Sequence, residues 1–472
     1  MIVHALRTAR SRQLLARARR PVARRHFPVE PVPPLDLLTA PVDLWRSDAF
    51  DPVWLAGGGR ERLRAFHVHY GEDALRLARL GDTAGVRAVM ERWIVQNPPR
   101  PSDAWHPYPL STRVGNWVAA LALEPDARTR RVAESLWRQL LHLERNVEND
   151  ILGNHVIRNV RALILGGAAF DSERLLGAGR TLLARELPEQ VMPDGGHYER
   201  SPAYHLLVLR DLVEIRAATS MTGLEETIER MRRFSAGLAR PDGRPALFND
   251  GGLDIAPIVE LPPSVEGLSL FPDTGYAVIR TPRIWLAFDC GPPSPPFLPA
   301  HAHADALSFQ LWVDGRPVIV DPGTYTYESG ADRDWFRGTR AHSTVAVDGD
   351  QFELWGAFRS GRLPQVELLE ASETELVASV TGRTGVRHVR RLRLGEGELV
   401  VEDRLEGEGR RTIESSLQFA PGVEPFARGA ARQVRERRWV SERFFERTEA
   451  AALVVREQRA LPAELGWTIP LA

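Results

Sequence analysis

The sequence predicts a multidomain α+β fold, with a helical domain followed by an antiparallel β domain. Between about residues 35 and 260, apolar residues recur at three- and four-residue steps, the spacing of amphipathic helices that pack on one another. Pro262-Pro263 and Phe271-Pro272-Asp273 then interrupt the chain. Beyond them come short apolar or alternating runs separated by turn residues, which is typical of an antiparallel sandwich.

The helical spacing falls into successive segments. They lie at 75–94, 117–143, 156–164, 175–183 and 204–215. Turn residues such as Pro193-Asp194-Gly195-Gly196 separate them. The segments pair without a strict sequence repeat. We therefore expect a helical bundle or an incomplete (α/α) toroid, and not a solenoid.

The second half carries the strand signals. Short apolar or alternating runs lie at 276–279, 284–288, 318–320 and 344–347. A hairpin is expected from Val386 to Leu405, turning at Gly395-Glu396-Gly397. The predicted domains are thus a basic arm at 1–34, a toroid or helical barrel at 35–262 and an antiparallel β-sandwich at 263–472.

Composition excludes several classes of protein. The chain has 472 residues and a net charge of -1, so no bulk charge favours nucleic acid. All 61 basic residues are arginine, which excludes a Schiff-base, general-base or P-loop lysine. Cys290 is the single cysteine, so neither an intrachain disulfide nor a cysteine zinc cluster can form. No nucleotide fingerprint and no Gly-x-Ser-x-Gly elbow is present.

The first 27 residues carry many arginines between short apolar pieces and lack the uninterrupted apolar core of a secretory signal. No apolar run reaches the length of a membrane span. The segment suits a basic amphipathic helix, a docking arm, or a solvated and partly helical extension. These three interpretations stay open at the level of sequence.

Six of the thirteen histidines gather in four clusters, and this concentration is the strongest chemical signal in the composition. The clusters are Asn154-His155, the stretch from His197 to His205, the pair His301 and His303, and Asp321 with Arg340 to Ser343. Because a proline-rich loop precedes the histidine pair and an apolar run follows, we expect both imidazoles on one face where a strand begins.

Each candidate also has a structural interpretation. His303, Asp321 and His342 form a plausible zinc triad. Asp321 also begins the sequence Asp-Pro-Gly, which is common in turns. Tyr204 lies on an apolar helical stripe and suits a core position. Asn154 suits a helix cap as well as a functional role. The remaining histidines, including His67 and His69, are interpreted as surface or satisfied core residues.

Taken together, the motifs resemble those of the heparinase II/III-like polysaccharide lyases, which include some alginate lyases. The resemblance runs from about Asp103 to beyond Gly349 and is specific for the superfamily but not for the sugar. It rests on Asn154-His155, His197…Ser201-Pro202-x-Tyr204-His205, His301-x-His303-x-Asp305, Val320-Asp321-Pro322-Gly323-Thr324-Tyr325 and Arg340-x-His342-Ser343-Thr344.

The resemblance implies β-elimination at a uronic acid within an acidic polysaccharide. Asn154, with His155, would neutralise the substrate carboxylate, and Tyr204 would serve as acid, or as acid and base together. As a base, Tyr204 would need a lowered pKa, which a neighbouring arginine could supply. His301 would be the other base.

The remaining roles also follow from the resemblance. His205 and Arg340 would bind substrate. His303, Asp321 and His342 would hold a structural zinc ion that fixes a sandwich loop beneath the toroid.

Two other functions remain as alternatives. A glycoside hydrolase would use paired carboxylates, for which Glu199, Asp250 and Asp305 are available. A non-catalytic protein of exopolysaccharide production would bind the polymer without cutting it. The resemblance implies the periplasm or cell envelope, whereas the absent signal sequence leaves the cytoplasm open. Sequence alone does not specify the uronate, the mode of cutting or the oligomeric state.

Overall fold

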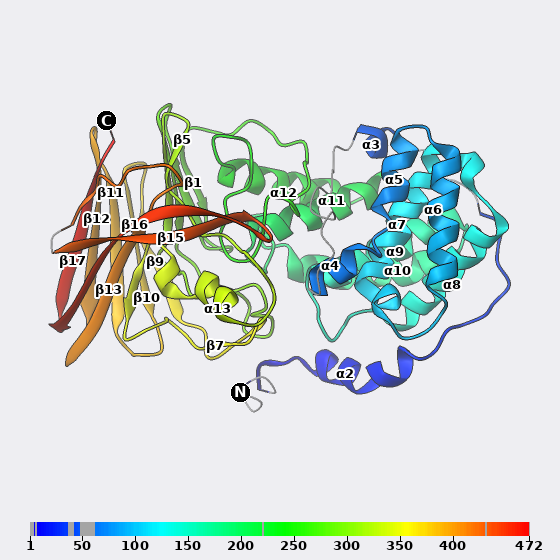
Figure 1. Ribbon diagram of the computed structural model, residues 1–472, viewed down its shortest axis with the longest axis horizontal. Helices are drawn as coiled ribbons and strands as arrows, with labels where there is room; N and C mark the ends of the chain where they lie inside the picture. The colour runs from blue at the N-terminus through cyan, green and yellow to red at the C-terminus, as the bar shows by residue number, and fades with distance from the viewer. Residues whose placement is uncertain are drawn as a thin grey trace.

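The computed structural model describes residues 4, 7–35, 42–47, 62–219, 221–429 and 432–471, and it confirms a helical domain followed by a sheet-rich domain. Figure 1 shows most of the helices on one side of the molecule and the sheets, with α13, on the other. Helix α2 of the predicted arm lies along the lower edge of that view. The first three residues of the arm, and residues 5 and 6, lie outside the described residues.

The helices follow the predicted segments. They are α2 (Ser11–Ala23), α3 (Val42–Ser47), α4 (Arg62–His67), α5 (Glu72–Arg79), α6 (Thr83–Gln96), α7 (Pro107–Leu123), α8 (Arg130–Arg145), α9 (Asn154–Ala169), α10 (Glu173–Gln190), α11 (Pro202–Thr219), α12 (Glu225–Leu238) and α13 (Ala331–Arg337). Single-turn 3-10 helices lie at Asp103–Trp105, Pro125–Ala127 and Thr339–Ala341. Within the described residues, no helix combines the length and apolar character needed to cross a bilayer.

Helix α9 forms the centre of the helical domain. It contacts α7, α8, α10 and α11, and nearly all of its residues are buried. A helix that is buried on every side has no solvent-facing stripe. This placement explains why the segment after Asn154 is so apolar. Asn154, the first residue of α9, is itself buried.

The strands form three larger sheets and one small hairpin. The five-stranded sheet has the order β1-β2-β3-β4-β5, the six-stranded sheet β14-β17-β12-β11-β10-β9, and the four-stranded sheet β15-β16-β13-β6. A two-stranded hairpin joins β7 to β8. The predicted hairpin after Val386 is confirmed, because β11 and β12 pair antiparallel.

The strand bounds are as follows. They are β1 (Gly267–Phe271), β2 (Tyr276–Arg280), β3 (Ile284–Asp289), β4 (Phe309–Val313), β5 (Arg316–Ile319), β6 (Val345–Val347), β7 (Leu354–Trp355), β8 (Arg359–Ser360), β9 (Gln365–Ala371), β10 (Glu375–Thr381), β11 (Arg387–Leu394), β12 (Glu398–Glu406), β13 (Arg410–Gln418), β14 (Arg428–Gly429), β15 (Gln433–Arg443), β16 (Glu446–Ala460) and β17 (Ala463–Pro470).

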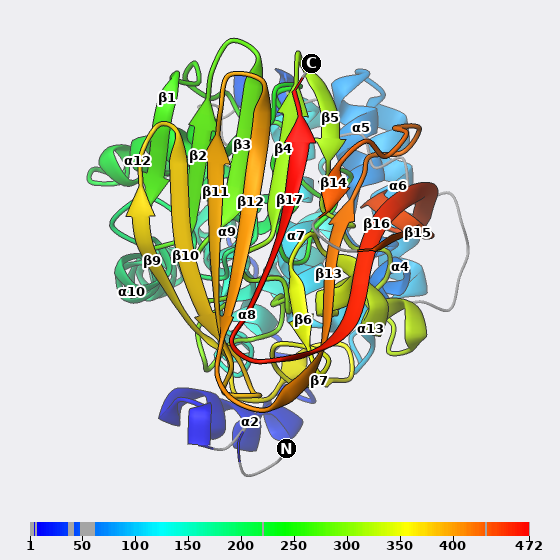
Figure 2. The same ribbon diagram turned by 90° about the vertical axis from the view of Figure 1, so that its left-hand side faces the viewer.

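The five-stranded sheet is the middle layer of the molecule. Ala277 and Ile279 join a core shared with the six-stranded sheet, whereas Tyr276 and Val278 pack with Phe234 of α12. Successive residues of a strand point to opposite faces. The sheet therefore buries both faces, one against the six-stranded sheet and one against the helical domain. Figure 2 shows the six-stranded sheet in front of it.

The long hairpin of β15 and β16 connects the two domains from the other side, as Figure 1 shows. Its tip carries Phe444, which is buried in a cluster with Tyr204 of α11 and Ile255. Phe444 also meets the Tyr327 ring edge-on, with centroids 4.7 Å apart. The hairpin tip thus places an apolar side chain against Tyr204, one of the predicted catalytic residues.

Candidate active site and metal centre

A cavity of about 1050 Å³ lies where the helical domain meets the sheets. This volume is at the upper end of the range for small-molecule sites and suits several sugar units. Four of the predicted catalytic residues line it, namely Asn154, His155, Tyr204 and His301. Residues 296–301 of the proline-rich loop form another part of its wall.

Tyr204 and His301 lie against each other on this wall. Their ring centroids are 4.0 Å apart, and the planes are tilted by 24°. The Tyr204 hydroxyl forms a 2.8 Å hydrogen bond with the hydroxyl of Tyr327. Burial raises the pKa of Tyr204 well above its ordinary value. The lowered pKa that Tyr204 would need to serve as a base is therefore not found, and the hydroxyl keeps its proton.

His301 is held between two carboxylates. Its Nδ1 lies 3.1 Å from Asp250 Oδ2, and its Nε2 lies 3.2 Å from Glu199 Oε2. Asp250 is buried on the inner side, whereas Glu199 lines the cavity. A ring fixed at Nδ1 by a buried carboxylate presents Nε2 in a constant direction. Nε2 thus points towards Glu199, which lines the cavity.

Glu199 also holds Asn154. The backbone N–H of Asn154 donates to Glu199 Oε1 at 2.7 Å, and its side-chain amide donates to Oε2 at 3.0 Å. The proposed capping role is wrong, because Gly153 occupies the N-cap and Asn154 makes no capping hydrogen bond. Gly153 has a φ of +64°, and a Cβ there would collide with the Glu199 carboxylate. Glycine at this position thus allows the contact.

His155 pairs with Glu148, a residue that sequence reasoning missed. Its Nδ1 lies 3.2 Å from Glu148 Oε1. Burial alone would lower the pKa of His155, but the Glu148 charge raises it above the ordinary value. Burial opposes ionisation of Glu148 too, yet His155 and His106 lower its pKa to about 2. Glu148 therefore favours the protonated form of His155, the residue next to Asn154 in the chain.

Asp250 is the carboxylate that organises the interior of the site. Besides His301 it contacts His303 Nε2 at 2.9 Å and both terminal nitrogens of Arg333, one of them at 2.6 Å. Burial alone would raise the pKa of Asp250, but the Arg333 charge and the hydrogen bonds hold it well below its usual range. Asp250 thus stays ionised and joins the two histidines of the His-x-His motif.

The expected placement of this motif at the start of a strand is wrong. His301 and His303 lie in an irregular segment, and β4 begins only at Phe309. One ring lines the cavity, whereas the other is fully buried. Without the strand alternation the two rings need not share a face, and they diverge around the Asp250 carboxylate. The sequence pattern located the pair but not its geometry.

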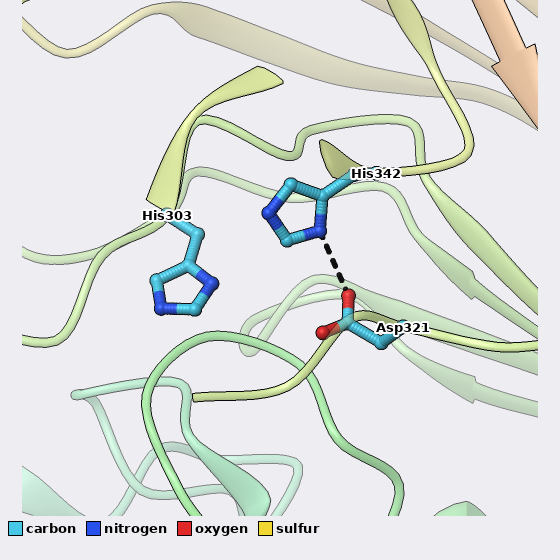
Figure 3. A group of neighbouring side chains, drawn as sticks. All are labelled: His303, Asp321 and His342. Atoms are coloured by element: carbon cyan, nitrogen blue, oxygen red, sulfur yellow. Dashed lines mark hydrogen bonds and ion pairs between the residues drawn. The ribbon is translucent and has the colours of Figure 1, made fainter. Parts of the chain in front are cut away.

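His303, Asp321 and His342 point towards one another, as Figure 3 shows. One nitrogen or oxygen from each lies within 4.8 Å of the other two, and all three residues are buried. His342 Nδ1 is 2.9 Å from Asp321 Oδ2. His303 Nδ1 has no hydrogen-bond partner among the described residues.

The outer nitrogens of both rings are already occupied. His303 Nε2 contacts Asp250, and His342 Nε2 lies 3.2 Å from the Phe336 carbonyl. Metal-binding histidines commonly donate the second N–H to a carboxylate or carbonyl in this manner. Two imidazoles and a carboxylate in one buried cluster therefore fit a zinc-type donor set.

The two predicted substrate-binding residues lie away from the cavity lining. His205 is buried, with Nδ1 accepting from the His197 N–H and Nε2 close to the Met231 carbonyl. Arg340 is half-exposed and pairs with Glu414 on β13. In contrast, His67 and His106 line the cavity, although the sequence suggested surface or satisfied core positions for them. Tyr327 does as well, and its only sequence signal was its proximity to the Asp321 motif.

Two family models match the chain in succession. One is described as "Heparinase II/III N-terminus" and covers residues 86–274. The other is described as "Heparinase II/III-like, C-terminal" and covers residues 263–470. Together they include the four predicted catalytic residues and the candidate metal triad, whereas the part of the cavity lining before residue 86 lies outside both matches.

Curated relatives are similar at low identity. FtsZ-localized protein C of Caulobacter vibrioides is 26% identical over 403 residues, which is 77% of this chain and 66% of that protein. A heparin-sulfate lyase of Pedobacter heparinus is 24% identical over 250 residues, which is 43% of this chain and 37% of the lyase. The matches thus span less than two thirds of each relative.

Solved structures share the fold. Heparinase III gives a TM-score of 0.73 at 18% identity, covering 89% of this chain and 79% of that one. Chondroitin AC lyase of Streptomyces coelicolor A3 gives 0.55 at 13% identity, covering 99% and 79%. At these identities the likeness concerns the fold alone.

Proposed function

The chain belongs to the heparinase II/III-like family, and from this premise we propose that it is a polysaccharide lyase acting on a uronate-containing acidic polysaccharide by β-elimination. The observation that carries the proposal is the stacked pair of Tyr204 and His301 on a cavity wall, with Asn154 joined to His301 through Glu199. The pair offers a protonated hydroxyl and an oriented imidazole at one place.

The reaction needs the C5 proton to become acidic. We assign the neutralisation of the substrate carboxylate to the Asn154 amide and the His155 cation. An amide donor and a positive charge stabilise the negative charge that develops as the proton leaves. The raised pKa of His155 supports this assignment, because the Glu148 charge favours the protonated ring.

His301 is the base in this proposal. Asp250 accepts from Nδ1–H, which selects the tautomer whose Nε2 carries the lone pair. Incoming substrate takes the place of the Glu199 contact at Nε2, and Nε2 removes the C5 proton. The electron pair of that C–H bond forms the C4–C5 double bond, and the C4–O4 bond breaks.

Tyr204 donates its proton to the departing O4. Its raised pKa supports the role of acid over that of base, since the hydroxyl is protonated before the bond breaks. The hydrogen bond from Tyr327 orients the phenol and stabilises the phenolate that forms. Proton exchange between the phenolate, the imidazolium and solvent then restores the starting state.

We further propose that His303, Asp321 and His342 hold a structural zinc ion. The unpartnered Nδ1 of His303 and the occupied outer nitrogens of both rings support it. Such an ion would cross-link three loops of the sheet domain and would leave proton transfer to the side chains above. Through Asp250, it would also fix the loop that carries His301.

A binding protein without turnover is the second candidate. The match to FtsZ-localized protein C spans more of this chain than the match to the Pedobacter heparinus lyase, and its name describes a location and not a reaction. A hydrolase has less support. Of Glu199, Asp250 and Asp305, only Glu199 lines the cavity among the described residues.

Ultraviolet absorbance of the new C4–C5 double bond tests the proposal. The purified chain is incubated with alginate, heparan sulfate, hyaluronan, chondroitin and polyglucuronate, and we expect absorbance to rise with at least one polymer. New reducing ends without absorbance would indicate hydrolysis. Binding without either product, unchanged in Tyr204→Phe, would indicate the second candidate.

A further inference from the structure

Helix α2 of the basic arm lies across the cavity between the two domains. On the helical side, Arg12 pairs with Glu189 at 3.0 Å and Arg20 pairs with Asp150 at 2.5 Å. On the side of the sheets, Gln13 Nε2 donates to the Phe297 carbonyl at 3.3 Å. The arm is therefore docked on both walls and is not a solvated extension.

Further contacts fix its two ends. Before the helix, Arg10 pairs with Glu189, and its guanidinium lies 3.7 Å above the Phe297 ring. After it, Phe27 stacks on His142 with centroids 4.7 Å apart. Docking at both ends holds one face of α2 in a constant orientation towards the cavity.

That face carries Gln13, Arg17 and Arg20, all of which line the cavity. Their spacing of four and three residues places them on one side of a helix. Arg19 is exposed and is not part of the lining. The sequence of the helix thus directs some arginines to the cavity and others to solvent.

Arginines outnumber carboxylates on the cavity wall. Among the described residues that line it, seven are arginine and four are carboxylates, namely Glu72, Asp150, Glu199 and Glu328. Three of the arginines pair with Asp211 or Glu214 behind the lining. Burial raises the pKa of Glu72 to about 8, which removes one negative charge at neutral pH. The lining therefore favours an anionic occupant.

Two of these arginines are distinguished by their lack of a counter-charge. Arg17 of α2 and Arg359 of β8 are exposed to the cavity, and neither has an ion pair or hydrogen bond from its side chain within the described ranges. The docking arginines, in contrast, each have a carboxylate partner. A guanidinium without a partner presents its donors in a planar fork that fits carboxylate and sulfate.

We propose that the arm is part of the substrate site, and that Arg17 together with Arg359 binds the carboxylate or sulfate of a sugar beyond the reacting uronate. The two residues come from different parts of the chain, one from the arm and one from the β7–β8 hairpin of the sheet domain. The arm also contacts this hairpin, because the His4 ring meets the Trp355 ring with centroids 5.9 Å apart. The arm thereby selects polymers that carry an anion on more than one sugar. This inference rests on the proposed function, because that function places a polysaccharide in the cavity.

Equilibrium binding tests the inference independently of turnover. Fluorescence anisotropy is measured with end-labelled hexasaccharides of heparan sulfate and of its unsulfated backbone, in a Tyr204→Phe background that does not cut the probe. Arg17→Gln and Arg359→Gln are compared with Arg19→Gln, a matched control on the same helix. Thermal unfolding of each variant checks that the chain is folded.

We expect Arg17→Gln and Arg359→Gln each to weaken binding roughly three- to tenfold, between the effect of an exposed ion pair and that of a buried charged hydrogen bond. The loss should shrink at about 1 M salt, where charges are screened beyond roughly 3 Å. A loss with both probes identifies carboxylate as the anion, and a loss with heparan sulfate alone identifies sulfate. Arg19→Gln should bind as the background does.

Equal binding by Arg17→Gln, Arg359→Gln and Arg19→Gln would overturn the inference, as would a failure of both probes to bind. Product formation by the chain with Tyr204 intact is scored separately. Product without a difference among the arginine variants removes the inference and keeps the lyase. A difference without product keeps the anion site and removes the lyase.

Discussion

Replacing Tyr204 by phenylalanine removes one oxygen atom and keeps the ring that stacks on His301. The two centroids lie 4.0 Å apart, and the ring packs in a cluster with Phe444, so the replacement fits without repacking. The hydroxyl bonds to Tyr327 at 2.8 Å. The substitution therefore isolates the effect of the Tyr204 proton.

The expected loss is large in turnover and small in stability. A positioned acid accelerates a reaction by about 10²- to 10⁴-fold, which corresponds to roughly 3–5 kcal/mol of transition-state stabilisation. The free energy of unfolding should fall by only about 1 kcal/mol, the net contribution of one neutral hydrogen bond. Substrate binding should change little, because the ring remains.

Tyr327→Phe is the matched control. It removes the same hydrogen bond from the other side and leaves the Tyr204 proton in place. Chemical denaturation should give a similar loss of stability for both variants. Initial rates of double-bond formation should fall far more for Tyr204→Phe than for Tyr327→Phe.

Two results would refute the assignment. Wild-type turnover in Tyr204→Phe would mean that another group protonates O4. Equal and large losses in both variants, at equal stability, would mean that the hydroxyl pair and not the Tyr204 proton carries the effect. Either result leaves the β-elimination itself to be judged by the absorbance of the product.

Four further predictions follow from the site. Asn154→Ala should lower kcat about 100-fold with little change in KM, as expected when one donor to a developing charge is lost; steady-state kinetics measures both. Glu148→Gln should lower the pKa of His155, because it removes the negative charge that raises this pKa. NMR titration of the ring measures it, and an unchanged pKa would mean that another group is responsible. Burial raises the pKa of Glu72 to about 8 from 4.5, so the unfolded chain loses this proton first and stability falls as pH rises between these values. Glu72→Gln should remove that slope in denaturation curves and be the more stable chain near pH 8. His303→Ala should abolish bound zinc in mass spectrometry and lower Tm, whereas equal zinc in both chains would exclude the triad.

Much of the fold could be predicted because burial leaves a periodic trace in the sequence. The three- and four-residue spacing around Val160 and Leu163 marks α9, and the alternation around Val389 marks the hairpin of β11 and β12. The docking of the basic arm could not be predicted. Its contacts join Arg12 to Glu189 across 177 residues, and no local pattern encodes such a pair.

The site was predictable in part as a set of residues but not as an arrangement, since His205 and Arg340 lie away from the cavity lining. Motif resemblance brought together Asn154, Tyr204 and His301, and all three line one cavity. It gave no sign that burial would raise the pKa of Tyr204, since that depends on what surrounds the ring in space. Glu148 was missed because an isolated acidic residue before a helix has no distinguishing signal. The compartment and the substrate-binding role of Arg340 stay predictions.

Asp250 links the candidate metal triad to His301, the proposed base. Its two oxygens contact His301 Nδ1 and His303 Nε2, and Arg333 binds both of them. A change in the position of His303 therefore shifts the carboxylate that sets the tautomer and direction of His301. Loss of a metal from the triad should then lower turnover although the metal contacts no substrate. The cost of removing the Asp250 charge is correspondingly high, because Arg333 would be left buried with only the Ala357 carbonyl and no counter-charge, a change that costs roughly 3–5 kcal/mol. In this chain the two histidines of the His-x-His pattern are therefore coupled, because the Asp250 carboxylate contacts both rings.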